Sequence, residues 1–514
     1  MRRSDWPMTS ETASAGYLPG EETPVSVNAA VRQGFLWNML NFLFSQGAGI
    51  VIFVALSRAL SPAIFGVFAL AAVIVDVFAL QGRWAAMDAL IQRQDFSRRA
   101  LSSAFFALMG VGIAITVGAA ASAGWAAAVF DAPSLSVVLP MLALTLVLTP
   151  PIVVMEALIM RRLQFRAQAI RSIIGTLVGG AVGIGVAFTP ALEWALVAQR
   201  LAGALVTLGV LFAFTRWAPS LEFDGASAMR FLRRAGQLWG TSMLASLHAR
   251  IIDAFVGVRA GAVSVGLISV ARRFETLLHG PVTGPIQGLW VPVLSALRQD
   301  RVQSWRLFLR LSQLAALVAL PAFLGLALVA NELIVIVFDE RYAAAGAVLT
   351  AVALQGVFMP AGFFANLVFA GLDRSDLSLK FSVLALATCA PVIWFAAAYG
   401  PVAAVLATTM VMGLAGVLAT AVQIRMLGGR CVEFARALAP GYSAVAAMTL
   451  ALLVLRQVAP IDDPLTSLLV QVSLGATVYV GWLFLFHRAQ LQEAWSFLSH
   501  RDVGVVAGAP AAAK

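Results

Sequence analysis

Charged residues are scarce in this sequence, and cysteine is almost absent. Asp, Glu, Lys and Arg make up 12% of the 514 residues, whereas soluble proteins use about 25%. With 2 cysteines in the chain, neither a disulfide framework nor a metal site is expected. A glycine-rich phosphate loop, an HExxH motif, a CxxC motif and a nucleophile elbow are also missing. These absences argue against a soluble globular protein, a disulfide-stabilised secreted protein and an ATP-driven pump.

The sequence is rich in long apolar runs. Hydrophobic residues make up 61% of the chain, and runs of about 18 or more, enough to cross a bilayer as a helix, recur along it. The runs do not alternate with a period of two, so barrel strands are not expected. The sequence therefore predicts an all-α polytopic membrane protein with about 14 transmembrane helices. We place them at 34–56, 64–90, 101–128, 135–160, 170–188, 193–214, 237–258, 263–293, 308–330, 343–370, 378–398, 401–424, 437–457 and 465–486.

Arginine is distributed unevenly over the connections between these spans. Alternate connections are rich in basic residues, whereas those between them hold few and contain acidic residues. Because basic loops stay on the cytoplasmic side of a membrane, both termini are predicted to be cytoplasmic. This distribution also accounts for the net charge of +10 without a nucleic-acid partner. The basic connections contain Arg93, Arg98, Arg99, Arg161, Arg162, Arg166, Arg171, Arg216, Arg230, Arg233, Arg234, Arg298, Arg301, Arg306, Arg310, Arg374, Lys380, Arg425, Arg430 and Arg436; the others contain Arg58, Arg259, Arg341 and Arg456.

Composition and internal similarity divide the chain into two lobes. We assign 1–30 to a disordered cytoplasmic tail, 31–215 to an N-terminal six-helix lobe, 216–236 to a cytoplasmic linker, 237–430 to a C-terminal six-helix lobe, 431–487 to an extra helix pair and 488–514 to a cytoplasmic tail. Three landmarks recur in register in the two lobes, which indicates a structural repeat. They are Gly34-Phe-Leu-Trp37 with Gly236-Gln-Leu-Trp239, Arg58 with Arg259, and Phe65-Gly66 with Val265-Gly266.

The stretch 263–293 is apolar enough to span a bilayer but carries Arg272, Arg273, Glu275 and His279 in its interior. A helix rises about 1.5 Å per residue, which places these side chains near the middle of a hydrocarbon core about 30 Å thick. A charge at that depth costs about 2.5–3.5 kcal/mol unless it faces protein or water. Arg272, Glu275 and His279 follow an i, i+3, i+7 spacing and share one stripe. This helix is therefore predicted to line a polar cavity.

Other polar side chains lie inside the spans of both lobes. Arg250 and Asp253 are spaced to pair on adjacent turns of one helix. Arg83, Arg272 and Arg273 are the stronger candidates for substrate binding, because carboxylates close in sequence do not neutralise all of them. Guanidinium groups match phosphate oxygens bidentately, so a shared cationic vestibule would suit a diphosphate. The candidate substrate-binding residues are Arg83, Arg200, Arg250, Arg272 and Arg273, and the predicted cavity-lining residues are Asn38, Asn41, Asp76, Asp253 and Glu275.

Three of the buried titratable groups are candidates for coupling transport to a proton or cation. They are His279, Asp76 and Asp253. A structural explanation also stays open: His279 as an ordinary buried histidine, the two aspartates as members of ion pairs, and Arg200 as a residue near the exofacial end of its helix. No cofactor is predicted.

Four short segments resemble motifs of a known transporter family. The turn Arg58-Ala-Leu-Ser-Pro-Ala-Ile-Phe-Gly66 and the basic connection Glu156–Arg166 resemble motifs of the Wzx-type oligosaccharide flippases. The segment Glu193–Val197 is similar to the start of their sixth helix, and Gly266–Arg273 to a helix of their second half, with Ile268 in place of the usual aromatic residue. The resemblance covers about 31–430 and places the chain with the multidrug/oligosaccharidyl-lipid/polysaccharide superfamily.

This resemblance implies a two-lobed transporter in the bacterial inner membrane with a cationic cavity that opens alternately to each side. Its substrate would be an undecaprenyl-diphosphate-linked oligosaccharide repeat unit for exopolysaccharide, capsule or O-antigen. Its partners would be this lipid-linked glycan, membrane lipids and the polysaccharide polymerase and export machinery. Energy would come from H⁺, Na⁺ or the membrane potential, which contributes about 2.3 kcal/mol per charge per 100 mV. The helix pair in 437–486 resembles the additional pair of the lipid II flippase MurJ, which flanks a groove for the lipid tail.

Three alternatives stay open. A multidrug or cation antiporter of the same fold would need an acidic or aromatic cavity, whereas the interior predicted here is rich in arginine. A membrane-embedded polymerase or glycosyltransferase would need catalytic carboxylates on a large exofacial loop, and Asp462-Asp463 before Pro464 is better explained as a turn. A scaffold without transport leaves the charges inside the spans unexplained.

Overall fold

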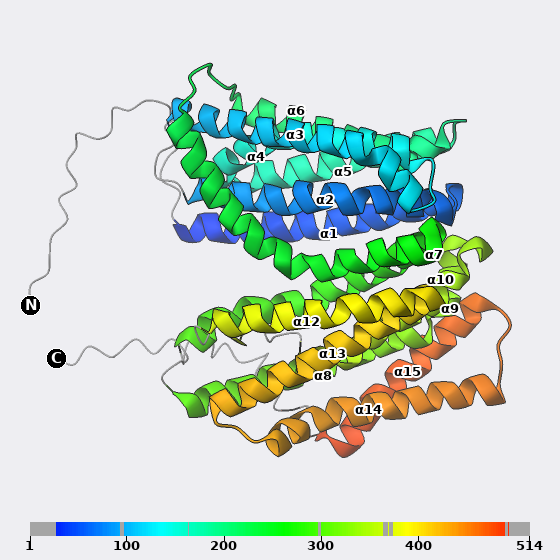
Figure 1. Cartoon of the computed structure of the whole chain (residues 1–514). Helices are drawn as coiled ribbons and strands as arrows, with labels where there is room; N and C mark the ends of the chain where they lie inside the picture. The colour runs from blue at the N-terminus through cyan, green and yellow to red at the C-terminus, as the bar shows by residue number, and fades with distance from the viewer. Residues whose placement is uncertain are drawn as a thin grey trace, which may run out of the picture. The chain divides into compact units, whose positions relative to one another are not determined.

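The computed structural model describes residues 27–92, 97–162, 164–296, 300–362, 368–369, 374–488 and 492. Every regular element in these ranges is a helix, which confirms the predicted all-α class (Figure 1). In chain order the helices are α1 (Val27–Ala59), α2 (Pro62–Ile91), α3 (Arg98–Val129), α4 (Leu135–Arg161), α5 (Phe165–Ala187), α6 (Ala195–Thr215), α7 (Gly225–Ala296), α8 (Arg301–Leu328), α9 (Ala330–Phe338), α10 (Ala344–Ala353), α12 (Ser375–Ala396), α13 (Pro401–Leu427), α14 (Cys431–Val458) and α15 (Pro464–Phe486).

The membrane spans follow the predicted apolar runs. Among the described residues, 12 helical stretches are long and apolar enough to cross a membrane, so the protein is a multi-pass membrane protein. The second predicted span is represented by the shorter apolar stretch Pro62–Asp76, and the seventh and eighth by the single stretch Arg250–His279 of α7. The predicted total of about fourteen is therefore approximate.

Helix α7 joins two predicted spans and part of the predicted linker. Its helical assignment is continuous except at Gly261, where φ is 79° and ψ is 171°. A positive φ costs glycine nothing, so this residue can separate two helical segments where another would be strained. Residues 225–236, which the sequence assigned to the linker, already belong to α7.

The predicted tenth span, 343–370, is interrupted. Helix α10 ends at Ala353 and is followed by two short 3₁₀ turns, Leu354–Val357 and Met359–Ala361. Pro360 has no N–H to donate within a continuing α-helix. The short helix α9 was also not predicted; its 9 residues extend too little to cross a bilayer.

The chain divides into two compact units, each with its own packing. The first comprises residues up to Leu60 and Ala71–Ala245; the second comprises Ser61–Leu70 and the residues from Ser246 onward. In the first unit α5 and α6 pack through small residues: a side chain at Gly179 would lie 3.1 Å from the Cα of Gly203. Small residues let helix backbones approach closely, which stabilises pairs of helices in lipid.

The connection before α7 is fastened to α3 within the first unit. The backbone N–H groups of Ser220 and Asp224 donate to the hydroxyls of Ser102 and Ser103 at 2.8 and 2.9 Å. Both α3 serines are fully buried. Satisfied backbone donors of this kind give the connection a defined path over the end of α3.

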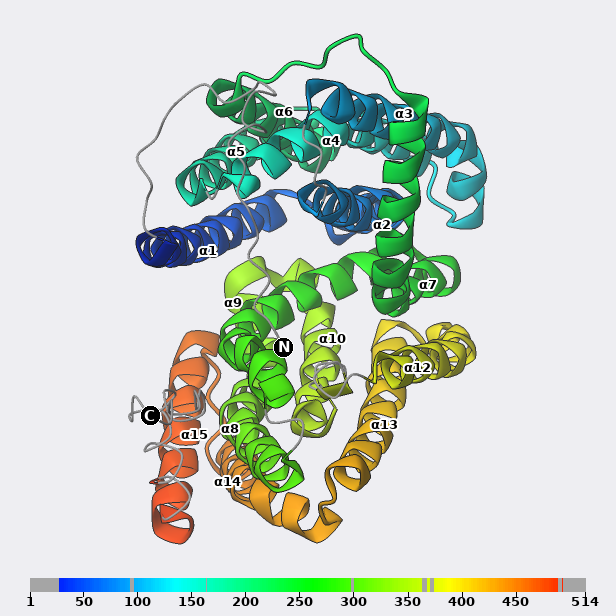
Figure 2. The same cartoon turned by 90° about the vertical axis from the view of Figure 1, so that its left-hand side faces the viewer.

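In the second unit, α14 and α15 pack against α8 (Figure 2). Trp305 and Phe308 of α8 stack with ring centroids 5.6 Å apart, and Phe434 of α14 stacks on Phe308 at 5.5 Å. The Tyr479 hydroxyl of α15 donates to the carbonyl of Leu317 at 2.8 Å. The extra helix pair therefore shares one apolar core with α8.

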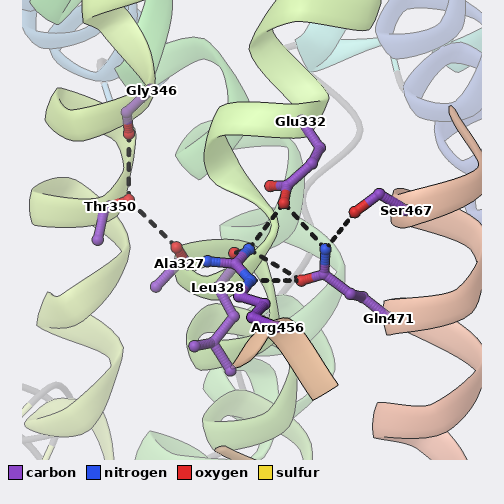
Figure 3. A network of polar contacts seen from close by, with 8 residues as sticks. All are labelled: Ala327, Leu328, Glu332, Gly346, Thr350, Arg456, Ser467 and Gln471. Carbon is purple, nitrogen blue, oxygen red and sulfur yellow. Dashed lines mark hydrogen bonds and ion pairs between the residues drawn. The ribbon is translucent and has the colours of Figure 1, made fainter. Parts of the chain in front are cut away.

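A polar network also fastens the extra pair to α9 (Figure 3). Arg456 of α14 donates to Glu332 of α9 at 2.9 Å and to Gln471 of α15 at 2.8 Å, and it also contacts the carbonyl of Leu328. Gln471 donates to Glu332 at 2.9 Å and to Ser467 at 2.7 Å. The network joins side chains of three helices, because the donors of Arg456 and Gln471 are matched by acceptors on their neighbours.

Replacing Arg456 by alanine is expected to lower the free energy of unfolding by about 1–3 kcal/mol, since Glu332 loses a charge-assisted partner. The Oε2 atom of Glu332 is buried and has no hydrogen-bond partner among the described residues. Thermal unfolding of the purified protein measures the change. Arg341→Ala is the matched control, because Arg341 and its partner Asp339 are half exposed and 3.3 Å apart, and such pairs contribute about 0–1 kcal/mol. Equal effects of the two substitutions would contradict a stabilising network.

Candidate functional site

Two arginines in the first unit share one buried glutamate. Arg83 of α2 donates from Nε to Oε2 of Glu156 at 2.8 Å and from Nη2 to Oε1 at 2.5 Å. Arg171 of α5 pairs with the same Oε1 atom and donates from Nε to Gln168 at 3.0 Å. Among the described residues, Glu156 is the only carboxylate paired with either arginine.

The local sequence explains how this cluster forms. Glu156 lies near the end of α4 and Arg171 near the start of α5. Residues 162–164 connect the two helices. Glu156 lies five residues before the end of α4 and Arg171 six residues after the start of α5. At a rise of about 1.5 Å per residue, both side chains therefore lie at a similar depth along their helices, roughly 8–9 Å from this connection. Arg83 then reaches Glu156 from α2.

The cluster carries an excess of positive charge. Two guanidinium groups and one carboxylate leave a net charge of one, buried among helices. The side chains of Glu156 and Arg171 are 1% and 11% exposed, whereas that of Arg83 is 28% exposed. Arg83 uses Nε and Nη2 for Glu156, so its two Nη1–H groups are not engaged by the described residues. An anion that approached this cluster would meet Arg83.

A second ion pair in the first unit is neutral. Arg200 of α6 donates to Asp76 of α2, and the Asp76 side chain is 11% exposed. Asp76 and Arg83 lie on one face of α2, yet each binds a partner on another helix. Arg200 therefore takes part in an ion pair between helices, which favours the structural explanation that the sequence left open for Asp76.

In the second unit, the predicted stripe of Arg272, Glu275 and His279 lines one cavity of about 400 Å³. Gln355, just after α10, and Thr408 and Thr409 of α13 add polar groups to its wall. Gln355 and Glu275 therefore line the same cavity. The stripe thus meets polar groups from two other helical regions, at the interruption of the tenth span.

The charge of Arg272 is compensated from within α7. Its Nη1 donates to Oδ1 of Asp253 at 2.6 Å, across the break at Gly261. The sequence proposed Arg250 as a partner of Asp253, and local spacing could not reveal that Arg272, from the other side of Gly261, binds this carboxylate. Arg250 and Arg273 do not line the 400 Å³ cavity.

The remaining predicted cavity residues lie in α1. The Asn41 carbonyl oxygen accepts a hydrogen bond from Ser45 at 3.0 Å, and the Ser45 hydroxyl lies 3.3 Å from that of Ser172 on α5. Asn41 therefore faces another helix. The side chain of Asn38 is outside the described residues. A vestibule shared by arginines of both lobes stays a prediction.

Two members of the cationic cluster escaped the sequence analysis. Glu156 was noted only as the first residue of the motif Glu156–Arg166 and Arg171 only among the basic residues of the connections, whereas both lie within helices and are largely buried. A signal existed: Glu156 follows Ile152-Val-Val-Met155 and precedes Ala-Leu-Ile159, so it is a carboxylate within an apolar run.

Comparison with known proteins identifies the family. Residues 55–347, more than half of the chain, match the model of a polysaccharide biosynthesis protein family. The chain belongs to this family. The chain is 25% identical over 343 residues to the succinoglycan biosynthesis transport protein ExoT of Rhizobium meliloti (strain 1021). This match covers 66% of this chain and 69% of ExoT. It is 23% identical to the lipopolysaccharide biosynthesis protein WzxC of Escherichia coli (strain K12), over 70% of this chain and 73% of WzxC.

A solved structure shows the same fold. The lipid II flippase MurJ in an inward closed conformation matches this polysaccharide biosynthesis protein with a TM-score of 0.73 at 14% identity. The match covers 89% of this chain and all of the MurJ chain. The expected resemblance to Wzx-type and MurJ-like transporters is therefore confirmed.

Proposed function

We propose that this protein is a flippase that moves undecaprenyl-diphosphate-linked oligosaccharide repeat units across the bacterial inner membrane for exopolysaccharide, capsule or O-antigen biosynthesis. The similarity to ExoT, a succinoglycan biosynthesis transport protein, and to MurJ, a lipid II flippase, supports this function. Alternating access is the proposed mechanism, with both termini on the cytoplasmic side. No residue in the proposal forms or breaks a covalent bond.

The observation that carries the proposal is the excess positive charge of Arg83, Glu156 and Arg171. A buried cationic group is costly unless an anion compensates it. Of the three, Arg83 is the most exposed, and its two Nη1–H groups are not engaged by the described residues. A guanidinium group can bind phosphate oxygens bidentately. Arg83 is therefore proposed to contact the diphosphate. Arg272, Arg273, Arg200 and Arg250 are weaker candidates, because Arg272 and Arg200 are already paired with aspartates.

Coupling is proposed at His279. It lines the 400 Å³ cavity, one helical turn from Glu275. Asp76 and Asp253 are weaker coupling candidates, since each would have to leave an arginine before binding a proton or Na⁺. The membrane potential alone also favours outward movement of an anionic head group, by about 2.3 kcal/mol per charge per 100 mV.

Arg83→Ala is expected to reduce transport at least about tenfold while the protein remains folded, because one charge-assisted contact contributes about 1.5–3 kcal/mol. The measurement is complementation in a depleted strain, with quantification of the undecaprenyl-linked repeat unit on the cytosolic leaflet. Arg83→Lys should recover only part of the activity, because lysine cannot form the bidentate fork.

The matched control is Arg166→Ala, since Arg166 lies on α5 but is exposed. Full transport by both Arg83 variants would remove Arg83 from the substrate site. Absence of any lipid-linked intermediate after depletion would contradict the flippase assignment itself.

A further inference from the structure

The interruption after α10 forms one wall of the 400 Å³ cavity in the second unit. Two 3₁₀ turns, Leu354–Val357 and Met359–Ala361, break the helix at this point. Gln355, Phe358 and Met359 of this stretch line the cavity. Irregular backbone within a membrane is tolerated where it is buried in protein or lines a cavity. The interruption is therefore a structural part of the cavity.

Hydroxyl groups of two neighbouring helices hold the interruption in place. The Tyr442 hydroxyl of α14 donates to the carbonyl of Val357 at 2.5 Å, and the Thr420 hydroxyl of α13 donates to the carbonyl of Ala361. A carbonyl group that leaves the helical hydrogen-bond pattern costs free energy in a membrane unless it finds another partner. Gln355 belongs to the same 3₁₀ turn as Val357, so the bond from Tyr442 also fixes the turn that carries Gln355.

The interruption also packs closely against α13. A side chain at Gly362 would lie 2.7 Å from the Cα of Gly416, and one at Gly413 would overlap the ring of Phe358. Backbones and rings this close leave no space into which the wall could relax. The position of Gln355 is therefore set by contacts with two helices, α13 and α14.

The cavity wall carries no excess of positive charge. Of the described residues, Arg272 and Glu275 are the ones with a formal charge that line it, and Arg272 is already paired with Asp253. This balance differs from that of the cationic cluster in the first unit, which suits a phosphate. An acidic group in the cavity would instead lie near the Glu275 carboxylate, and like charges placed together oppose binding.

The polar groups of the wall suit a sugar. Gln355 has an amide that both donates and accepts, and the Glu275 carboxylate accepts hydrogen bonds. The Thr408 hydroxyl donates to the carbonyl of Ala404 at 2.8 Å, which leaves its oxygen able to accept. The rest of the lining is largely apolar, and the volume falls within the range of about 300–1,000 Å³ typical of small-molecule sites. A sugar ring, with hydroxyl groups at its edge and C–H groups on its faces, has this combination of surfaces.

We propose that this cavity binds an uncharged sugar of the lipid-linked head group, with Gln355 as the specificity-determining residue and Tyr442 as its positioning residue. The proposal rests on the flippase function proposed above and names the class of sugar for it. A carboxylated sugar is disfavoured because Glu275 already places a negative charge in the wall. The extra helix pair thereby takes part in recognition, since α14 supplies the hydroxyl that holds the interruption.

Binding of three lipids to the purified full-length protein in nanodiscs tests the site. They are undecaprenyl diphosphate alone, the same lipid bearing glucose, and the same lipid bearing glucuronic acid. The glucosyl lipid is expected to bind at least about fivefold more tightly than the bare lipid, because the sugar adds hydrogen bonds. The glucuronosyl lipid is expected to bind no more tightly than the bare lipid, and Glu275→Gln should remove this discrimination.

Gln355→Leu should abolish the preference for the glucosyl lipid. The readout is the ratio of the affinities for the glucosyl and the bare lipid within one variant, so a general loss of binding cancels. An unchanged ratio in Gln355→Leu, or equal binding of the two lipids by the unaltered protein, would overturn the site.

Tyr442→Phe and Tyr479→Phe form a matched pair for the positioning role. Each removes a hydroxyl of the extra helix pair that donates to a backbone carbonyl, that of Val357 for Tyr442 and that of Leu317 in α8 for Tyr479. Leu317 lies outside the cavity lining. Tyr442→Phe should lower the affinity ratio at least about threefold, whereas Tyr479→Phe should lower the free energy of unfolding and leave the ratio as it is.

Equal ratios in the two tyrosine variants would overturn the positioning role of Tyr442. If the sugar preference is measured but no lipid-linked intermediate accumulates on depletion, the sugar site stands and the flippase assignment fails. If the intermediate accumulates and the preference is absent, the sugar site fails and the flippase assignment stands.

Discussion

Replacing Glu156 by glutamine is expected to lower the free energy of unfolding by about 3–5 kcal/mol, the usual effect of removing one partner of a buried ion pair. Glu156 is the shared anion of Arg83 and Arg171, and its side chain is 1% exposed. Glutamine keeps the shape but leaves two guanidinium groups close together without a counter-charge. Thermal unfolding followed by tryptophan fluorescence measures the loss.

A second substitution separates charge from packing. In the double variant Glu156→Gln with Arg171→Gln, the net charge of the cluster returns to its original value, and at least half of the lost stability should return. Glu193→Gln is the matched control, because Glu193 belongs to the same unit and is exposed. A single variant that unfolds like the wild type would show that Glu156 does not stabilise the cluster.

The pair of Arg272 and Asp253 should respond asymmetrically to substitution. The Asp253 side chain is 6% exposed and that of Arg272 is 26% exposed. Arg272→Gln leaves the more deeply buried charge without a partner and is expected to cost about 3–5 kcal/mol. Asp253→Asn leaves the guanidinium group, which can reach the cavity, and should cost clearly less.

Combining the two substitutions distinguishes a structural from a substrate-binding role of Arg272. The double variant removes both charges, so the unfolding free energy should recover. Transport should stay impaired, because Arg272 lines the cavity beside Glu275 and His279. Full recovery of transport in a double-mutant cycle would instead make the ion pair purely structural.

The spans could be predicted because the transfer of an apolar run into a bilayer is nearly independent of its neighbours. Each of the fourteen predicted runs coincides with helical residues, at least in part. The interruption after Ala353 was missed because hydropathy does not register a change from α-helix to 3₁₀ turns. Pro360 within the predicted span was the available sign.

The partners of the buried charges could not be predicted in the same way. Helical spacing suggested the pair of Arg250 and Asp253, which lie within a single helix. It gave no sign of the pairs between residues 73 and 124 positions apart, Arg83 with Glu156 and Arg200 with Asp76. Spacing identifies which side chains share a face of a helix, but not which other helix covers that face.

The sequence by itself determined the helical membrane class and the approximate spans, because hydrophobicity and periodicity are properties of contiguous residues. Only the tertiary structure decided that Glu156 pairs with both Arg83 and Arg171 and that Arg456 of α14 bonds to side chains of α9 and α15. It also decided that Gly66 lies against the backbone of Ala262 in α7. Each of these contacts depends on the packing of helices far apart in the chain, where a shift of one turn would give every charged group a different neighbour.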